Sequence, residues 1–228
     1  MIDSNNQYDV IIIGTGAGGG TVAHTLASTG KRILILERGE FLPREKDNWD
    51  PKTVYQDKHY YTNETWRDGD GNELTPQTCY WVGGNTKVYG AALLPMRDRD
   101  FYAITHKGGV SPAWPLSYDD FSPYYAEAEA LFSVHGQTGE DPTEPARFDY
   151  PYPPVQHEPS MQRISNGLEK LGYHPFHLPI GLRLNQSDRS QSDCIRCDTC
   201  DGFPCLVGGK ADAEMNCIRP VRDQKQVT

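Results

Sequence analysis

The sequence predicts an α/β fold that opens with a strand–helix–strand unit, and three patterns near its start indicate this unit. Residues 8–13 form a β-branched apolar run that stops at a glycine, which is typical of a parallel strand buried on both faces. Between 19 and 29 the apolar residues share one helix face, and Gly30 stands where a helix C-cap is common. A second apolar run over 33–36 predicts the second strand.

The composition restricts the classes of function. Of the 228 residues, 37% are hydrophobic and 11% aromatic, and the apolar runs are short, which predicts a globular chain without a membrane span. A net charge of −9 without a run of Lys or Arg argues against nucleic acid and anionic membranes as partners, so we expect small molecules. The first residues lack a basic region followed by an apolar stretch, so we expect a cytoplasmic protein.

The middle of the chain has weaker patterns. Residues 41–78 are polar and aromatic with turn signals, so we expect irregular structure there. Ser117 and Asp120 have capping-box spacing and predict a helix over 117–134. Six prolines between 142 and 159 indicate an extended segment between subdomains, and the amphipathic pattern directly after the last of them predicts another helix.

A glycine-rich turn joins the first strand to the first helix. Residues 14–19 read Gly-Thr-Gly-Ala-Gly-Gly and fit G-x-G-x-x-G in the context that this motif requires. The first glycine permits the tight turn, the second lets the backbone approach a pyrophosphate, and the third lets the helix pack on the strand. The helix N-terminus offers unpaired N–H groups to the phosphates. The turn predicts a Rossmann-like dinucleotide site with the candidate residues Gly14, Gly16, Ala17, Gly18 and Gly19.

Two residues after the second strand extend this site. Glu37 follows the first glycine at close to the offset of about 20 residues that is usual for a ribose-binding carboxylate. A carboxylate there disfavours a 2′-phosphate because two anions repel, although Arg38 beside it leaves NADP open. NAD and FAD share the adenosine and pyrophosphate, so the strand–helix–strand unit alone does not separate them. The alternative is a glycine-rich turn with a surface glutamate.

A second glycine pair lies within residues 80–92, which read Tyr-Trp-Val-Gly-Gly-Asn-Thr-Lys-Val-Tyr-Gly-Ala-Ala. This segment resembles the second flavin-contacting segment of the glucose-methanol-choline (GMC) oxidoreductases. Its glycines allow close backbone approach, and its polar side chains suit hydrogen bonds to a flavin ring or pyrophosphate. The family often has Asn where this chain has Tyr89, whose ring could stack or whose hydroxyl could donate. The resemblance implies the candidate residues Gly83, Gly84, Asn85, Thr86, Tyr89 and Gly90; an ordinary Gly-Gly turn is the alternative.

Further motifs follow in the order that the family shows. Residues 114–118 resemble its W-P-x-S-Y motif, 123–129 resemble the P-Y-Y and A-E motifs after it, and 208–220 resemble its return into the FAD domain. The resemblance implies a Rossmann-like FAD-binding domain with part of a second, substrate-side subdomain. The expected division is an FAD-binding core over 1–115, a partial substrate or cap subdomain over 116–190, and a cysteine-rich segment over 191–228 that returns to the FAD domain.

The resemblance also implies a reaction. FAD is the expected cofactor and a small-molecule alcohol the expected substrate, with a base taking the hydroxyl proton while a hydride passes to the flavin. In the family the catalytic histidine comes from a C-terminal region that this chain does not contain, so no catalytic residue is assigned. We expect an incomplete N-terminal part that binds FAD weakly or needs a separate polypeptide for turnover. An iron–sulfur electron carrier, a nonenzymatic FAD-binding remnant and an NAD-dependent dehydrogenase stay open as alternatives.

Five of the six cysteines lie within residues 194–217. The spacing C-x2-C-x2-C-x4-C resembles the iron–sulfur run C-x2-C-x2-C-x3-C-P, with one extra residue and a proline before the last cysteine. Four thiolates could also hold zinc. The alternative is a set of buried or redox-labile cysteines without a metal. The candidate metal ligands are Cys194, Cys197, Cys200 and Cys205.

Overall fold

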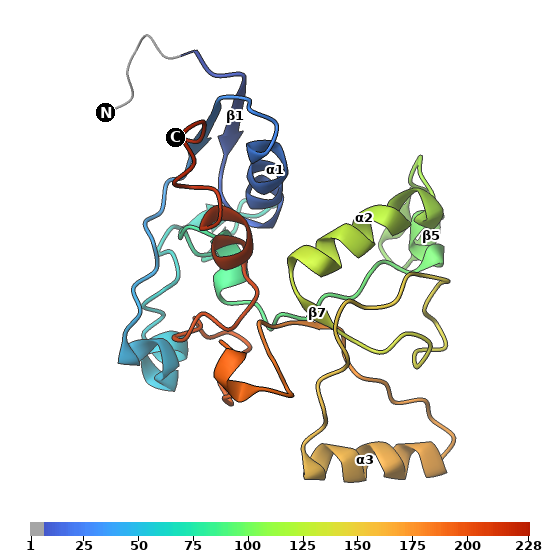
Figure 1. Cartoon of the computed structure of the whole chain (residues 1–228). Coiled ribbons are helices and arrows are strands. Elements are labelled where there is room, and N and C mark those ends of the chain that lie inside the picture. Colours follow the sequence, from blue (N-terminus) through green and yellow to red (C-terminus); the bar gives the residue numbers. More distant parts are fainter. Residues whose placement is uncertain (1–6) are drawn as a thin grey trace. The chain divides into compact units, whose positions relative to one another are not determined.

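The computed structural model describes residues 7–228 and divides them into two compact units (Figure 1). Unit 1 combines the chain up to Ala91 with Arg183–Thr228, and unit 2 is Ala92–Leu182. The first boundary lies before the one expected at 115/116, because segment 92–115 hydrogen-bonds within unit 2: the Leu93 N–H donates to the carbonyl of Pro179.

Unit 1 contains the predicted strand–helix–strand unit. Strand β1 (Val10–Ile13) leads into helix α1 (Ala17–Ala27), and strand β2 (Ile33–Leu36) pairs with β1 in parallel. Gly30, at φ +74°, lies shortly after the end of α1, as expected for a residue that stops a helix. Residues 226–228 run along β2, where the N–H of Ile35 donates to the carbonyl of the last residue.

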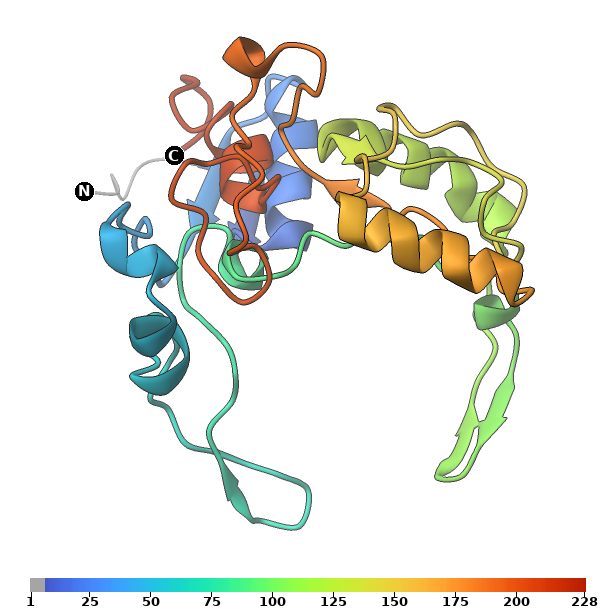
Figure 2. The ribbon, with the colours of Figure 1, turned by 90° about the horizontal axis from the view of Figure 1, so that it is seen from below.

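The expectation that β1 is buried on both faces is wrong. Ile12 is 6% exposed and belongs to the core cluster, whereas Ile13 is 84% exposed. The short helix η6 (Glu214–Ile218) packs beside α1, as Figures 1 and 2 show, so both cover the same face of β1. No element of residues 7–228 covers the other face in this way. The core cluster consists of Ile12, Ala23, Ile33, Val82 and Ile218.

The segment 41–78 is irregular, as predicted, but contains short elements. Its two-residue strands β3 (Trp66–Arg67) and β4 (Glu73–Leu74) pair antiparallel. Asn48, Val54 and Tyr60 are almost fully buried there. The remaining short helices of unit 1 are η1 (Lys46–Trp49), η2 (Lys52–Gln56), η3 (Gly84–Lys87) and η5 (Arg189–Gln191).

Unit 2 contains both helices predicted from the middle of the chain. Helix α2 (Tyr118–Leu131) begins with the predicted capping box, in which Ser117 Oγ accepts from the Asp120 N–H and the Asp120 carboxylate accepts from the Ser117 N–H. Helix α3 (Pro159–Lys170) carries proline at its first position, where the missing N–H costs nothing. No helix of residues 7–228 has the length and apolar character needed to cross a membrane.

Short strands complete unit 2. A hairpin projects from it, formed by β5 (Ile104–His106) and β6 (Gly109–Ser111) and visible in Figure 2. Strands β7 (Val134–His135) and β8 (Ile180–Gly181) pair antiparallel and join segments that are far apart in the sequence. One further short helix, η4, covers Asp98–Phe101.

Candidate cofactor-binding site

Five of the predicted site residues line one cavity of about 300 Å³ in unit 1, namely Gly14, Gly16, Glu37, Arg38 and Gly84. The other predicted residues do not line it: Ala17, Gly18, Gly19, Gly83, Asn85, Thr86, Tyr89 and Gly90. The end of β1 contributes Ile13 and the glycine-rich turn, and the end of β2 contributes Glu37 and Arg38. Tyr80 and Gly84 line it from the second glycine segment. A dinucleotide site requires this meeting of two strand ends with a glycine-rich turn.

The glycines of the turn have the geometry that the motif predicts. Gly14 has φ +88°, which favours glycine. A Cβ atom at Gly14, Gly16 or Gly18 would meet no atom within 4 Å, so open space lies in front of the turn. A Cβ at Gly19 would lie 2.0 Å from the Gly14 oxygen, so only glycine lets helix and turn pack this closely. The turn therefore leaves room for a pyrophosphate.

Glu37 is held at the cavity by the glycine-rich turn itself. Its Oε2 atom accepts from the Thr15 N–H at 2.8 Å and from the Thr15 hydroxyl at 2.5 Å, and its Oε1 atom accepts from the Gly39 N–H at 2.9 Å. Burial alone would raise the pKa of Glu37, but these hydrogen bonds outweigh it and hold the pKa below its usual value. A carboxylate oxygen has two lone pairs, so Oε1 can still accept from a ribose hydroxyl.

Thr15 connects the two glycine segments and was missed by the sequence reasoning. Its side chain is 3% exposed, and its hydroxyl donates to Glu37 while accepting from the Gly83 N–H at 3.0 Å. A Cβ atom at Gly84 would lie 3.1 Å from the Gly16 Cα atom, so the two segments touch there. The available signal was a hydroxyl residue at the first variable position of the motif, which by itself predicts no partner.

Arg38 is already paired within the protein. Its guanidinium lies over the Tyr80 ring, 3.7 Å from the ring centre, and Nη2 is 2.7 Å from Oε1 of Glu64. The Tyr80 hydroxyl donates to the same carboxylate at 2.5 Å. Because the guanidinium has both an aromatic and an anionic partner, it does not need a 2′-phosphate to balance its charge.

The polar side chains of the second glycine segment mainly hold the segment itself. The Asn85 oxygen accepts from the Cys79 N–H at 3.0 Å and from the Thr78 hydroxyl at 3.1 Å, so only the NH₂ group of this side chain is left for a cofactor. The Thr86 hydroxyl donates to the Gly83 carbonyl and accepts from the Ala213 N–H. The Tyr89 hydroxyl donates to the carbonyl of Ala211 at 2.5 Å. Gly90 packs against the Asp201 side chain, because a Cβ atom at Gly90 would lie 2.9 Å from Asp201 Oδ1.

A buried ion-pair cluster joins η3 to residues 212–214. The Lys87 ammonium lies 2.9 Å from Asp212 and 2.5 Å from Glu214, and all three side chains are at most 7% exposed. Glu214 also pairs with Arg219 at 2.5 Å. This cluster holds the residues just after the second glycine pair in place, so the cavity wall depends on residues more than 120 positions away.

Known proteins are similar to this chain, either over its first strand–helix–strand unit or over most of its length. The model of a family described as an FAD binding domain matches residues 9–42. Paromamine 6′-oxidase of Streptomyces fradiae is 28% identical over 96% of the chain, which spans 39% of that relative. An uncharacterized GMC-type oxidoreductase of Sinorhizobium fredii is 24% identical over 90% of the chain and 34% of the relative. The chain thus spans less than two fifths of each of these two relatives.

The chain is therefore similar, over nearly its whole length, to part of the GMC oxidoreductases, and residues 9–42 match an FAD-binding family model. A solved structure agrees in fold: pyridoxine 4-oxidase from Mesorbium loti superposes with a TM-score of 0.55 over 97% of this chain and 42% of its own, at 16% identity. The expected Rossmann-like α/β fold is confirmed.

The cysteine-rich segment of the chain does not group the ligands of the expected metal site. Among residues 7–228, no three His, Cys, Asp or Glu side chains are grouped as metal ligands, so the proposed set of Cys194, Cys197, Cys200 and Cys205 is not assembled. The Lys210 ammonium, 1% exposed, donates to the carbonyls of Cys200 at 2.6 Å and Phe203 at 2.8 Å. Burial raises the pKa of the Cys194 and Cys200 thiols.

Proposed function

We propose that this chain binds FAD and provides the cofactor part of a GMC-type oxidoreductase that acts on the CH–OH group of a small-molecule alcohol. The observation that carries the proposal is the cavity between the two glycine segments, with the Glu37 carboxylate held at its rim by Thr15. The resemblance along the whole chain supports a flavin rather than a nicotinamide cofactor. Arg38, already paired with Glu64, supports FAD over NADP.

The residues present fit an adenine dinucleotide. The open space before Gly14 and Gly16 suits the pyrophosphate, and the N-terminus of α1 directs its free N–H groups there. Oε1 of Glu37 suits a ribose hydroxyl, while Thr15 holds the carboxylate and the second glycine segment in register. FAD, when bound, supplies the redox chemistry by accepting a hydride. This chain positions the cofactor and supplies the electrostatic surroundings.

We further propose that turnover requires residues from a separate polypeptide, which would include the base for the substrate hydroxyl. Support comes from Ile11 of β1, an apolar side chain that is 59% exposed and does not line the cofactor cavity. Paromamine 6′-oxidase is named after paromamine. This name supports a small polar alcohol as the substrate class.

All six cysteines are free thiols, which supports a cytoplasmic location because disulfides form in oxidising compartments.

A flavin titration tests the cofactor proposal. Purified protein mixed with FAD is expected to retain flavin bands at roughly 370 and 450 nm after gel filtration. Gly16→Ala is expected to weaken FAD binding by at least about tenfold, because its Cβ would enter the space of the pyrophosphate. Gly167→Ala in α3 is the matched control, since its Cβ also meets no atom. Equal FAD affinity in both variants would contradict the proposed site.

A dye-reduction assay tests the need for a partner. The FAD-loaded chain, mixed with primary and secondary alcohols and an electron-accepting dye, is expected to show no alcohol-dependent reduction. Reduction by the isolated chain would overturn the partner proposal while leaving FAD binding intact.

A further inference from the structure

Three side chains contact one another at the cofactor cavity. Arg38 and Tyr80 line the cavity, and Glu64 comes from the irregular segment 41–78. The Arg38 guanidinium lies 3.7 Å from the centre of the Tyr80 ring. Glu64 joins the two, because its Oε1 atom is 2.7 Å from Arg38 Nη2 and its Oε2 atom accepts from the Tyr80 hydroxyl at 2.5 Å. Each of the three side chains therefore contacts the other two.

These contacts fix the plane of the Arg38 guanidinium. A long surface side chain samples many rotamers, and ordering it opposes ligand binding. Here Tyr80 supports one face of the guanidinium and Glu64 holds one edge. The hydrogen bonds from Tyr80 and Arg38 also hold the pKa of Glu64 below its usual value, so this carboxylate stays ionised at neutral pH. A ligand that contacts Arg38 meets a group whose orientation is already set.

The other face of the guanidinium is open to the cavity. The Arg38 side chain is 61% exposed although Tyr80 covers one of its faces. Arg38 lines the cavity together with Ile13 and Leu36, two apolar side chains that are 84% and 41% exposed. A planar, weakly hydrated cation next to exposed apolar side chains suits a flat aromatic ring system.

The residue before Arg38 indicates which part of the cofactor reaches it. Glu37 lines the same cavity, and its Oε1 atom suits a ribose hydroxyl under the proposed function. In an adenosine group, the base is attached to the ribose carbon next to the one that carries the 2′-hydroxyl. A ribose held at Glu37 therefore brings the adenine base within reach of Arg38, while the pyrophosphate extends towards Gly14 and Gly16.

We propose that the Arg38 guanidinium stacks on the adenine base of the cofactor, and that Glu64 is the positioning residue that holds Arg38 for this contact. The inference rests on the proposed FAD site and adds to it the recognition of the base. The order of the layers is Tyr80, Arg38 and adenine. Nucleic-acid bases stack on guanidinium planes in the same way, and the contact depends on the plane as well as on the charge.

Replacements of Arg38 separate its plane from its charge. Arg38→Lys keeps the charge and Arg38→Met removes it, but both lack a planar group. Both are expected to weaken FAD binding by about tenfold in flavin fluorescence titrations. The Arg38 and Glu64 side chains are 61% and 41% exposed, so their replacement keeps the fold. A lysine variant that binds FAD as tightly as the wild type would overturn the proposal, because the charge alone would then suffice.

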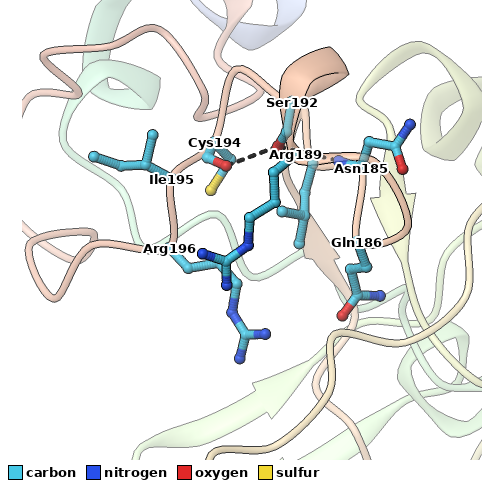
Figure 3. A pocket seen from close by; sticks show the side chains of 8 residues that line it. Asn185, Gln186, Arg189, Ser192, Cys194, Ile195 and Arg196 are labelled. Atoms are coloured by element: carbon cyan, nitrogen blue, oxygen red, sulfur yellow. Dashed lines mark hydrogen bonds between the residues drawn. The ribbon is translucent and has the colours of Figure 1, made fainter.

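Arg189→Met is the matched control. Arg189 is an exposed arginine of unit 1, but it lines a separate cavity of about 140 Å³ (Figure 3). That cavity shares no lining residue with the cofactor cavity. The control is expected to bind FAD as the wild type does. A loss equal to that of Arg38→Met would overturn the proposal, because FAD would then respond to the loss of any arginine charge.

Glu64 is tested through Arg38. Glu64→Ala is expected to weaken FAD binding by about fivefold, and to have no further effect when it is combined with Arg38→Met. Glu64→Gln keeps an oxygen for the guanidinium and is expected to restore most of the affinity. A loss that persists in the Arg38→Met background would overturn the positioning role, because Glu64 would then act by another route.

A nuclear Overhauser experiment tests the contact itself. Protein with ¹³C-labelled arginine, saturated with ADP, is expected to show cross-peaks between the adenine protons and one arginine side chain, and Arg38→Lys is expected to remove them. No such cross-peaks at saturation would overturn the inference while FAD binding by the wild type, and with it the proposed function, stands. A wild type that does not bind FAD would contradict both.

Discussion

Thr15 and Glu37 are joined by two hydrogen bonds that end on a single carboxylate oxygen. The backbone N–H and the hydroxyl of Thr15 donate to Oε2 at 2.8 and 2.5 Å, across 22 positions of sequence. The same hydroxyl accepts from the Gly83 N–H. One buried side chain thus sets the position of the carboxylate, the glycine-rich turn and the second glycine segment, and several predictions depend on it.

Replacing Thr15 tests this link directly. Thr15→Val keeps the shape but leaves the Gly83 N–H without its acceptor, and we expect unfolding to become easier by about 1–3 kcal/mol. FAD binding is expected to weaken by about tenfold, since Glu37 loses a hydrogen bond that orients it. Thr15→Ser retains the hydroxyl and should restore both properties. Chemical unfolding and flavin fluorescence titration measure them, and a valine variant that binds FAD as tightly as the serine variant would contradict this role.

The lowered pKa of Glu37 predicts a pH dependence. Burial opposes ionisation, but the hydrogen bonds from Thr15 and Gly39 prevail, so the folded protein binds a proton on Glu37 more weakly than the unfolded chain does. The stabilisation is therefore present above the usual glutamate pKa of about 4.3 and is lost as the pH falls through the lower, folded pKa. We expect the difference in unfolding free energy between the wild type and Glu37→Gln to shrink below that value. A difference constant from neutral to acidic pH would contradict the assignment.

Two neighbouring glycines predict opposite effects on stability. A Cβ at Gly19 would lie 2.0 Å from a backbone oxygen, so Gly19→Ala must displace α1 or the turn and is expected to cost about 1–3 kcal/mol or more. A Cβ at Gly18 meets no atom within 4 Å, and alanine favours helices, so Gly18→Ala is expected to leave the FAD-free protein unchanged or up to about 1 kcal/mol more stable. Thermal unfolding without FAD compares them, and equal stability of the two variants would argue against the close packing at Gly19.

Lys87 provides a test of the buried ion-pair cluster. Lys87→Met leaves the Asp212 and Glu214 carboxylates buried without their ammonium, which is expected to cost about 3–5 kcal/mol of stability. Lys52→Met is the control, because the Lys52–Asp57 pair is exposed to solvent and such pairs contribute at most about 1 kcal/mol. Urea unfolding measures both. Similar losses in the two variants would mean that the cluster is not buried in solution.

The sequence by itself determined the elements whose signals are local. The apolar runs, the glycine-rich turn and the capping box at Ser117 each involve residues a few positions apart, and the strand–helix–strand unit and α2 appear where these patterns predict them. The position of Glu37 also followed, because a parallel strand that returns beside the first places its end near the turn.

Only the tertiary structure decided which distant groups meet. The Thr15 hydroxyl accepts from the Gly83 N–H, 68 positions away. The Lys87 ammonium pairs with the Asp212 and Glu214 carboxylates, 125 and 127 positions away. The cysteine spacing predicted a metal site, but only the fold placed the Lys210 ammonium against the Cys200 carbonyl in that loop. The exposure of Ile13 could likewise not be predicted from the sequence, because burial depends on what packs against a strand and not on the residues of the strand itself. Periodicity reports the conformation of a segment, whereas the partners of its side chains depend on the path of the whole chain.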